Sequence, residues 1–194
     1  MILATLSLVI AVLNSRSLDS LGDTISKIDK ISFEGFISIL IPARNEESRI
    51  GECLGALTQE SYNHLEILIL DDQSTDETAQ IIESHIESDP RMRIISGTEL
   101  PNGWIGKHWA CEQLFRESKG DVILFMDADT VLSKGTISAS IHEFIQNNAD
   151  LLTIMPRRIA NCITERLVLP FIDWIVFSWM PMKAAKKKRS PYLS

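Results

Sequence analysis

Residues 121–129, Asp-Val-Ile-Leu-Phe-Met-Asp-Ala-Asp, place two carboxylates directly after an uninterrupted apolar run. The five apolar residues from Val122 to Met126 predict a strand that is buried on both faces of a parallel sheet. Such sheets bind ligands outside the carboxyl ends of their strands, which is where Asp127 and Asp129 would project. Carboxylate oxygens suit Mg²⁺ or Mn²⁺, and these ions usually complete their coordination with phosphate oxygens. The stretch therefore predicts a metal-assisted reaction on a phosphorylated substrate.

Strand and helix patterns alternate over the middle of the chain, and Pro42 is expected to end the first strand. This alternation is typical of βαβ crossovers and predicts an α/β fold. We expect three layers in a Rossmann-like arrangement, with a mainly parallel sheet covered by helices on both sides. The expected strands are residues 36–41, 65–70, 93–96, 121–126 and 151–155, and the expected helices are 50–59, 76–87, 109–118 and 136–147.

Composition excludes several classes of protein. The 194 residues are 45% hydrophobic and 23% charged, which is typical of a globular chain. The net charge of −7 argues against nucleic acid as a partner, because no basic surface offsets phosphate repulsion. Cys53, Cys111 and Cys162 are odd in number and widely spaced, which fits neither a disulfide framework nor a zinc site. The first two fall in expected helices, where a buried thiol is the simplest interpretation.

Residues 1–13 are almost wholly apolar and are a candidate membrane anchor. As a helix, the apolar stretch would span about 18 Å, which is less than the roughly 30 Å of the hydrocarbon layer. The alternative is an N-terminal helix that packs on the protein itself. Arg16 favours a cytoplasmic position for the domain that follows. Residues 14–35 are polar and mixed in composition, and we expect them to be a linker.

Residues 161–194 form a segment of different composition. Aromatic residues lie among aliphatic ones up to Met182, and a cluster of cations from Lys183 to Arg189 follows. This pattern is typical of an amphipathic helix in the headgroup layer of a membrane, where each cation near an anionic leaflet adds about 1 kcal/mol. A membrane surface is therefore an expected partner. An ordinary core helix is the alternative.

Two further polar clusters follow expected strands. Asp71 and Asp72 come after the second strand and should share the sheet edge with the first pair of carboxylates. Ser74 and Glu77 have the spacing of a capping box for the next helix, but that role does not need the two aspartates. Carboxylates at this location commonly accept hydrogen bonds from a nucleoside. Residues 44–47, Arg-Asn-Glu-Glu, form the third cluster, after the first strand.

The three clusters together resemble the family-2 glycosyltransferases of the GT-A fold, over roughly residues 37–156. The resemblance implies that residues 36–160 form a nucleotide-sugar-binding GT-A domain. It also implies that a sugar moves, with inversion, from a UDP-sugar to a lipid-like acceptor. The resemblance further implies that Asp127 and Asp129 hold the diphosphate and the metal, and that Asp129 is the more direct metal ligand. The implied nucleoside residues are Pro42, Asn45, Glu46, Asp71 and Asp72.

Residues 101–110, Pro-Asn-Gly-Trp-Ile-Gly-Lys-His-Trp-Ala, narrow the resemblance. They are similar to a subgroup of membrane-associated bacterial enzymes linked to hopanoid and carotenoid glycosylation, which implies a catalytic domain that faces the cytoplasm. Glycines let the backbone approach a diphosphate, and Lys107 brings a cation to the start of a helix. We therefore expect Lys107 to contact the ligand. Trp104 is predicted either to stack on a sugar or base, or to be buried under the loop.

A phosphatase is the main rival interpretation. The motif that begins at Asp127 also matches haloacid-dehalogenase-like proteins, in which the first aspartate is a nucleophile. That family needs a further acidic pair after another strand, and no such pair follows Asp150. Its motif also normally opens the domain, whereas three strand–helix units precede it here.

An inverting transfer needs a general base that deprotonates the acceptor hydroxyl, and the motifs above do not identify one. The resemblance places it on the acceptor side, later in the chain than Asp129. Asp150 and Glu165 are the nearby carboxylates, and neither matches the acidic motif of the family. We therefore expect the base beyond residue 194 and the fold to be incomplete at its C-terminal end. The chain alone is then expected to transfer sugar poorly and to behave as a nucleotide-binding fragment.

Overall fold

The computed structural model describes residues 2–15, 21–25, 33–60, 62–157 and 162–179. The chain divides into two compact units, residues 24–153 and residues 1–23 with 154–194. The first unit carries the sheet and all three polar clusters. The predicted domain boundaries at residues 13, 35 and 160 stay predictions.

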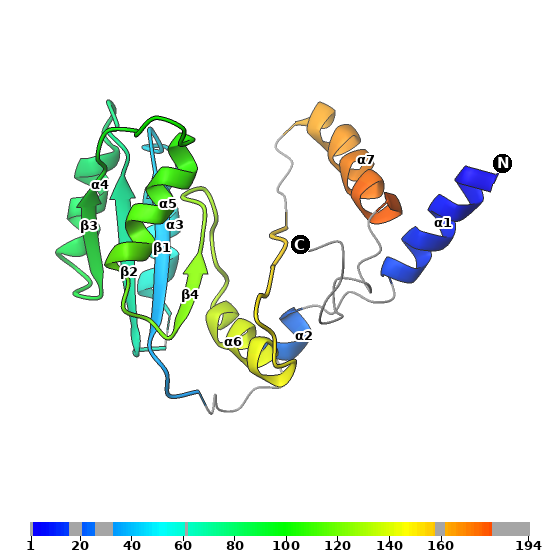
Figure 1. Ribbon diagram of the computed structural model, residues 1–194, viewed down its shortest axis with the longest axis horizontal. Coiled ribbons are helices and arrows are strands. Elements are labelled where there is room, and N and C mark those ends of the chain that lie inside the picture. The colour runs from blue at the N-terminus through cyan, green and yellow to red at the C-terminus, as the bar shows by residue number, and fades with distance from the viewer. Residues whose placement is uncertain (1, 16–20, 26–32, 61, 158–161, 180–194) are drawn as a thin grey trace. The chain divides into compact units, whose positions relative to one another are not determined.

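The sheet of the first unit has parallel strands, in the order β3-β2-β1-β4 (Figure 1). The central strand β1 pairs with β2 on one side and with β4 on the other, so that Ile37 lies opposite both Leu65 and Val122. The predicted α/β class with a parallel sheet is confirmed. The strands are β1 (Ile37–Ala43), β2 (Leu65–Asp71), β3 (Met92–Ser96) and β4 (Val122–Phe125).

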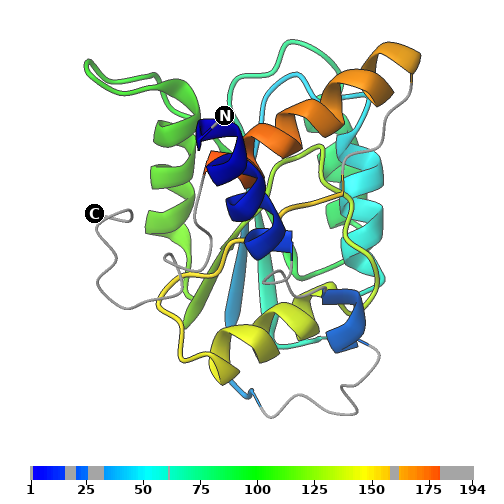
Figure 2. The same cartoon turned by 90° about the vertical axis from the view of Figure 1, so that its right-hand side faces the viewer.

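Helices cover both faces of this sheet, as predicted (Figure 2). Successive side chains of a strand point to opposite faces. Ile39 accordingly packs with residues of α3, α4 and α6, whereas Leu40 packs with Ala110 and Leu114 of α5. Three layers result, with one helix on one face and three on the other. The helices are α3 (Ile50–Thr58), α4 (Thr78–Ile86), α5 (Gly106–Glu117) and α6 (Thr136–Gln146).

The prediction that Pro42 ends the first strand is wrong, because β1 continues to Ala43. The Leu40 carbonyl accepts a hydrogen bond from Met126, on the β4 side of β1. Since hydrogen-bonding direction alternates along a strand, Pro42 faces that same side. Strand β4 has already ended there, at Phe125. The missing N–H of the proline therefore costs no ladder hydrogen bond.

Two expectations about the β4 edge are also wrong. Residues 151–155 were expected to form a strand, but residues 151–157 have no regular secondary structure. Strand β4 was expected to be buried on both faces, yet Phe125 is 53% exposed. The two differences are connected, because no strand from residues 151–155 pairs with β4. Within the described part of the chain, β1 is the only strand that pairs with β4, which makes β4 an edge strand.

The second unit contains α1 (Ile2–Ser15) and α7 (Ile163–Trp179), which pack against each other. Both helices keep large apolar side chains exposed, among them Leu8, Leu167, Phe171 and Trp179. None of the helices in the described residues is both long enough and apolar enough to cross a membrane. A short helix, α2 (Leu21–Ile25), lies within the predicted linker. The basic cluster at 183–189 lies outside the described residues.

Arg91 ties strand β3 to the end of helix α3. Its guanidinium donates to the Asp89 carboxylate at 2.7 Å, and also to the backbone carbonyls of Leu57, Glu60 and Tyr62. The two side chains are largely buried, at 18% exposure for Arg91 and 7% for Asp89. The arginine holds the pKa of Asp89 below its usual value through the hydrogen bond between them.

We predict that Arg91→Met lowers the free energy of unfolding by about 3 kcal/mol, because it leaves a buried carboxylate and several carbonyls unpaired. The matched control is Arg93→Met, which removes an exposed pair with Glu117 and should cost less than about 1 kcal/mol. Urea unfolding followed by circular dichroism measures both. Equal losses in the two variants would contradict the structural role of Arg91.

Candidate functional site

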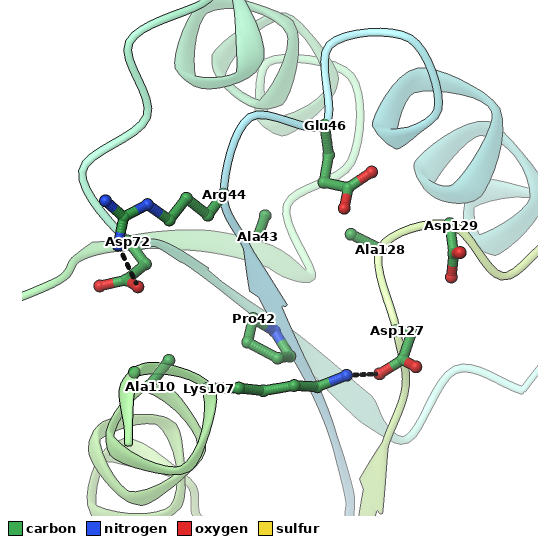
Figure 3. A pocket seen from close by; sticks show the side chains of 11 residues that line it. Pro42, Ala43, Arg44, Glu46, Asp72, Lys107, Ala110, Asp127, Ala128 and Asp129 are labelled. Carbon is green, nitrogen blue, oxygen red and sulfur yellow. Dashed lines mark hydrogen bonds and ion pairs between the residues drawn. The ribbon is translucent and has the colours of Figure 1, made fainter. Parts of the chain in front are cut away.

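A cavity of about 290 Å³ opens at the carboxyl ends of the strands (Figure 3). It lies where the topology changes direction, because α3 covers one face of β1 and α5 covers the other. Helices that leave a sheet on opposite faces open a crevice between their strands, and open α/β sheets bind ligands there. The lining residues are Pro42, Ala43, Arg44, Glu46, Asp72, Gly106, Lys107, Ala110, Asp127, Ala128 and Asp129.

The structure brings most of the predicted site residues together in this cavity. Glu46 follows β1, Asp72 follows β2, Asp127 and Asp129 follow β4, and Lys107 comes from the first turn of α5. Their side chains point toward a shared space in Figure 3. Pro42 also lines the cavity, whereas Asn45, Asp71 and Trp104 are not among its lining residues. The ligand contacts assigned to all of these residues stay predictions.

Asn45 joins the loops that follow β1 and β2. Its side-chain oxygen accepts the Thr75 N–H at 2.9 Å, and its own N–H donates to the Ser74 hydroxyl at 3.0 Å. Asn45 also has a positive φ of 54°, a conformation that asparagine adopts more readily than most residues. Asp71 has a similar local role, because its carboxylate accepts the Ser74 N–H. Neither side chain lines the cavity, and both hold the backbone of the loop that carries Asp72.

The predicted capping box of α4 is wrong in its residues. Ser74 bonds to the neighbouring loop, and Glu77 makes no side-chain cap at the helix start. Asp76 provides the side-chain acceptor at the start of α4 instead, because its carboxylate accepts hydrogen bonds from both the N–H and the hydroxyl of Thr78. The hydroxyl bond is the main reason why the pKa of Asp76 lies below its usual value. The Thr78 hydroxyl in turn accepts the Glu46 N–H at 2.8 Å, which fixes the backbone of a lining residue.

Asp72 and Arg44 form one end of the cavity. The Asp72 side chain is 16% exposed and lies 3.5 Å from the Arg44 guanidinium. A Cβ added to Gly106 would lie 3.9 Å from the Asp72 carboxylate, so α5 borders the same space. Sequence reasoning quoted Arg44 in the motif but gave it no role in the site. Its position directly after a strand end was the available signal.

Lys107 and the last two carboxylates form the other end. The Lys107 ammonium donates to Asp127 Oδ1 at 2.7 Å, and this bond is the main reason why the pKa of Lys107 is raised. On the α3 side, the Arg49 guanidinium lies 3.9 Å from Asp129 Oδ2. All of these side chains are well exposed. Sequence reasoning did not single out Arg49.

The loop before α5 leads into this end of the site. Helix α5 begins at Gly106, three residues earlier than predicted, which places Lys107 in its first turn. The helix start has no acidic residue and no side-chain cap at Ile105. The free N–H groups and the dipole of such a helix start favour the binding of an anion there. Trp104 is exposed and packs edge-on against Trp109 at 5.1 Å, so it is not buried under the loop.

The two carboxylates fit a divalent ion only in combination with other ligands. No group of three or more histidine, cysteine, aspartate or glutamate side chains that could hold a metal ion occurs among the described residues. Asp127 and Asp129 offer oxygen ligands only. Mg²⁺ is typically bound in this way, through one or two carboxylates, with substrate phosphates completing the coordination.

None of the three cysteines lines the cavity. Burial raises the pKa of Cys53 to about 12, and the nearby charge of Asp129 adds to the effect. Cys53 lies in α3 and Cys111 in α5, as predicted, and all three cysteines are free. Cys53 is a buried residue of the hydrophobic core rather than a nucleophile.

Known proteins resemble this chain in sequence. The model of the family described as Glycosyl transferase family 2 matches residues 38–190. A 4,4'-diaponeurosporenoate glycosyltransferase of Staphylococcus haemolyticus is 34% identical over 137 residues, which are 70% of this chain and 36% of that protein. The corresponding protein of Staphylococcus aureus is 34% identical over 66% of this chain and 34% of its own length. The chain thus spans about a third of the length of these curated relatives.

Solved structures resemble the fold. A mannosyltransferase from Pyrobaculum calidifontis, in complex with GDP-Man and Mn²⁺, superposes with a TM-score of 0.55 at 20% identity, over 73% of this chain and 42% of that one. TarS of S. aureus in complex with UDP-GlcNAc gives 0.52 at 23% identity, over 65% of this chain and 37% of that one. At these identities the likeness establishes the fold, which is the predicted GT-A arrangement.

Gly97 sets the position of the second loop. Its N–H donates to the Asp71 carbonyl at 2.8 Å. A Cβ at this position would lie 3.0 Å from the Asp71 carbonyl oxygen and 3.1 Å from the Asp72 Cα, both of them backbone atoms. Any larger residue must therefore push on the backbone that carries Asp72.

We predict that Gly97→Ala destabilises the protein by about 1–3 kcal/mol, as overpacking against backbone does. Gly55→Ala in α3 is the control, because nothing lies within 4 Å of the added Cβ. That change should stabilise the helix by up to about 1 kcal/mol. Denaturant unfolding distinguishes the two signs, and a neutral Gly97→Ala would show that the loop yields easily.

Proposed function

This chain belongs to glycosyl transferase family 2, and we propose that it binds a nucleoside diphosphate sugar and serves in transfer of the sugar. The observation that carries the proposal is the cavity that gathers Glu46, Asp72, Asp127 and Asp129 from the ends of β1, β2 and β4, and Lys107 from the start of α5. We propose a UDP-sugar as the donor and a lipid-like molecule as the acceptor. The cavity volume of about 290 Å³ is close to the roughly 300 Å³ at which small-molecule sites begin.

The nucleoside is proposed to bind at the Asp72 end. A largely buried carboxylate accepts hydrogen bonds from a ribose hydroxyl or a base N–H more selectively than an exposed one, because few waters compete for it. Pro42 and Ala43 supply apolar wall beside it. Arg44 lies 3.5 Å from the Asp72 carboxylate and compensates its charge.

The diphosphate is proposed to bind between the start of α5 and the two later aspartates. Lys107 and the backbone N–H groups of the first helical turn are donors for phosphate oxygens. Asp127 and Asp129 would hold Mg²⁺ or Mn²⁺ together with those oxygens. A bound divalent ion stabilises charge on the departing diphosphate as a Lewis acid. Lys107 contributes to the same end electrostatically, where negative charge accumulates.

Transfer itself is proposed to be an inverting displacement. The acceptor hydroxyl oxygen bonds to the anomeric carbon as the bond from that carbon to the phosphate oxygen breaks. A general base takes the hydroxyl proton, and the nucleoside diphosphate leaves. Asp150 does not line the cavity, and Glu165 lies in helix α7 of the other unit. We assign the base to neither residue.

The lipid-like acceptor and the membrane association are proposed from the relatives and from exposed apolar side chains. The curated relatives are named for glycosylation of 4,4'-diaponeurosporenoate, and we extend only the class of acceptor to this chain. Apolar side chains exposed on α1 and α7 support contact with a membrane surface. A catalytic domain that faces the cytoplasm is part of the same proposal. No observation favours the phosphatase alternative, and the family match stands against it.

We predict that UDP binds at least about tenfold more tightly with Mn²⁺ than without it, because the ion joins the carboxylates to the diphosphate. Asp129→Asn should remove most of this gain. Asp150→Asn is the matched control, since it neutralises an exposed aspartate that does not line the cavity. Calorimetric titration measures all of these affinities.

The outcomes separate the alternatives. A wild-type chain that binds no UDP with Mn²⁺ contradicts the proposed donor, and equal UDP affinity with and without the ion contradicts the metal role. Release of phosphate from phosphomonoesters would favour the phosphatase instead.

A further inference from the structure

Each of the two later carboxylates of the site is paired with a cation. Lys107 reaches Asp127 from α5 at 2.7 Å, and Arg49 approaches Asp129 from the start of α3 at 3.9 Å. The two cations therefore come from opposite faces of the sheet. The shorter contact is a charge-assisted hydrogen bond, and the longer one is a looser ion pair. In both cases a protein cation lies at a carboxylate proposed to hold a divalent ion.

The Lys107–Asp127 pair is suited to being broken. Its side chains are 61% and 58% exposed, and exposed pairs of this kind contribute little to stability. A lysine ammonium on a flexible four-carbon stem can turn to a second partner, unlike the rigid fork of arginine. Lys107 also lies in the first turn of α5, where the helix dipole disfavours a cation and favours an anion. The ammonium is therefore poorly placed for helix stability and well placed to meet a phosphate.

We propose that Lys107 is a counter-ion switch, which neutralises Asp127 in the empty site and turns to the diphosphate when the nucleotide arrives with its metal. This inference rests on the proposed function. In the empty site the two cations balance the two carboxylates. A divalent ion alone would have to displace Lys107, whereas a metal and a diphosphate together leave the total charge nearly balanced. Lys107 thereby couples the two binding events.

The proposed switch and a purely structural role of Lys107 predict opposite changes in Mn²⁺ affinity when Lys107 is removed. If Lys107 competes for Asp127, its removal frees the carboxylate, and Mn²⁺ alone should bind the nucleotide-free protein more tightly. If Lys107 only holds Asp127 in place, its removal should weaken Mn²⁺ binding. If Lys107 only contacts phosphate, its removal should leave Mn²⁺ binding unchanged.

The test is Lys107→Met, measured first with Mn²⁺ alone by electron paramagnetic resonance of the free ion. We expect Mn²⁺ affinity to rise by about two- to fivefold, the size of effect that an exposed lysine–carboxylate pair has. Titration with UDP at saturating Mn²⁺ should show the opposite change, a loss of affinity of about fivefold or more. Since coupling is reciprocal, the factor by which Mn²⁺ improves UDP binding should fall in the variant.

Two further variants control for charge. Lys134→Met removes an exposed lysine that does not line the cavity, and it should leave both affinities within about twofold of wild type. Lys107→Arg keeps the charge and should not raise Mn²⁺ affinity. Circular dichroism establishes that each variant folds.

Unchanged or weaker Mn²⁺ binding in Lys107→Met would overturn the switch, and so would unchanged UDP affinity. A wild-type protein that binds Mn²⁺ but no UDP would instead overturn the proposed function. The failures of the two proposals are therefore distinguishable.

Discussion

The site depends on the central position of β1 in the sheet. This strand is almost fully buried, and it pairs with β2 on one side and β4 on the other. Because the chain crosses to the opposite face with α5, the loops after β1 and β4 separate and leave a cavity between them. No single loop contains the site. It exists because parallel strands that are distant in sequence end at the same edge.

This edge was predictable from the sequence, because locating it requires only the positions of the strands and their parallel direction. The apolar runs identified the strands, and the polar residues after each run had to meet once the strands were parallel. Glu46, Asp72 and Asp129 were therefore predictable as neighbours. Lys107 was predictable as well, since glycines and a cation precede a helical pattern. The fold class followed from the same alternation of strands and helices.

Other features depend on contacts that a linear pattern does not carry. Asn45 and Asp71 have side chains suited to a ligand, yet Asn45 bonds to the loop that follows β2, and Asp71 bonds within that same loop. The same side chains could bind a ligand or hold a loop, so only the packing of the loops shows which hydrogen bonds they make. The continuation of β1 through Pro42 depends on where a neighbouring strand ends. The exposure of β4 likewise depends on which strands pair with it, and hydrophobicity alone cannot supply that information.

The two ends of the cavity differ in how they are held, and this difference bears on how each part of a ligand would be bound. At the Asp72 end, where the nucleoside is proposed to bind, backbone and side-chain hydrogen bonds join the loops, and the Asp72 N–H bonds to the Ala43 carbonyl at 2.8 Å. A subsite built in this way is formed before the ligand arrives, so little ordering entropy is lost on binding. At the Lys107 end, where the diphosphate is proposed to bind, exposed ion pairs provide the main side-chain contacts, and such pairs rearrange at low cost. A rigid nucleoside subsite next to an adjustable diphosphate subsite suits a ligand whose charge is complete only when its metal is present.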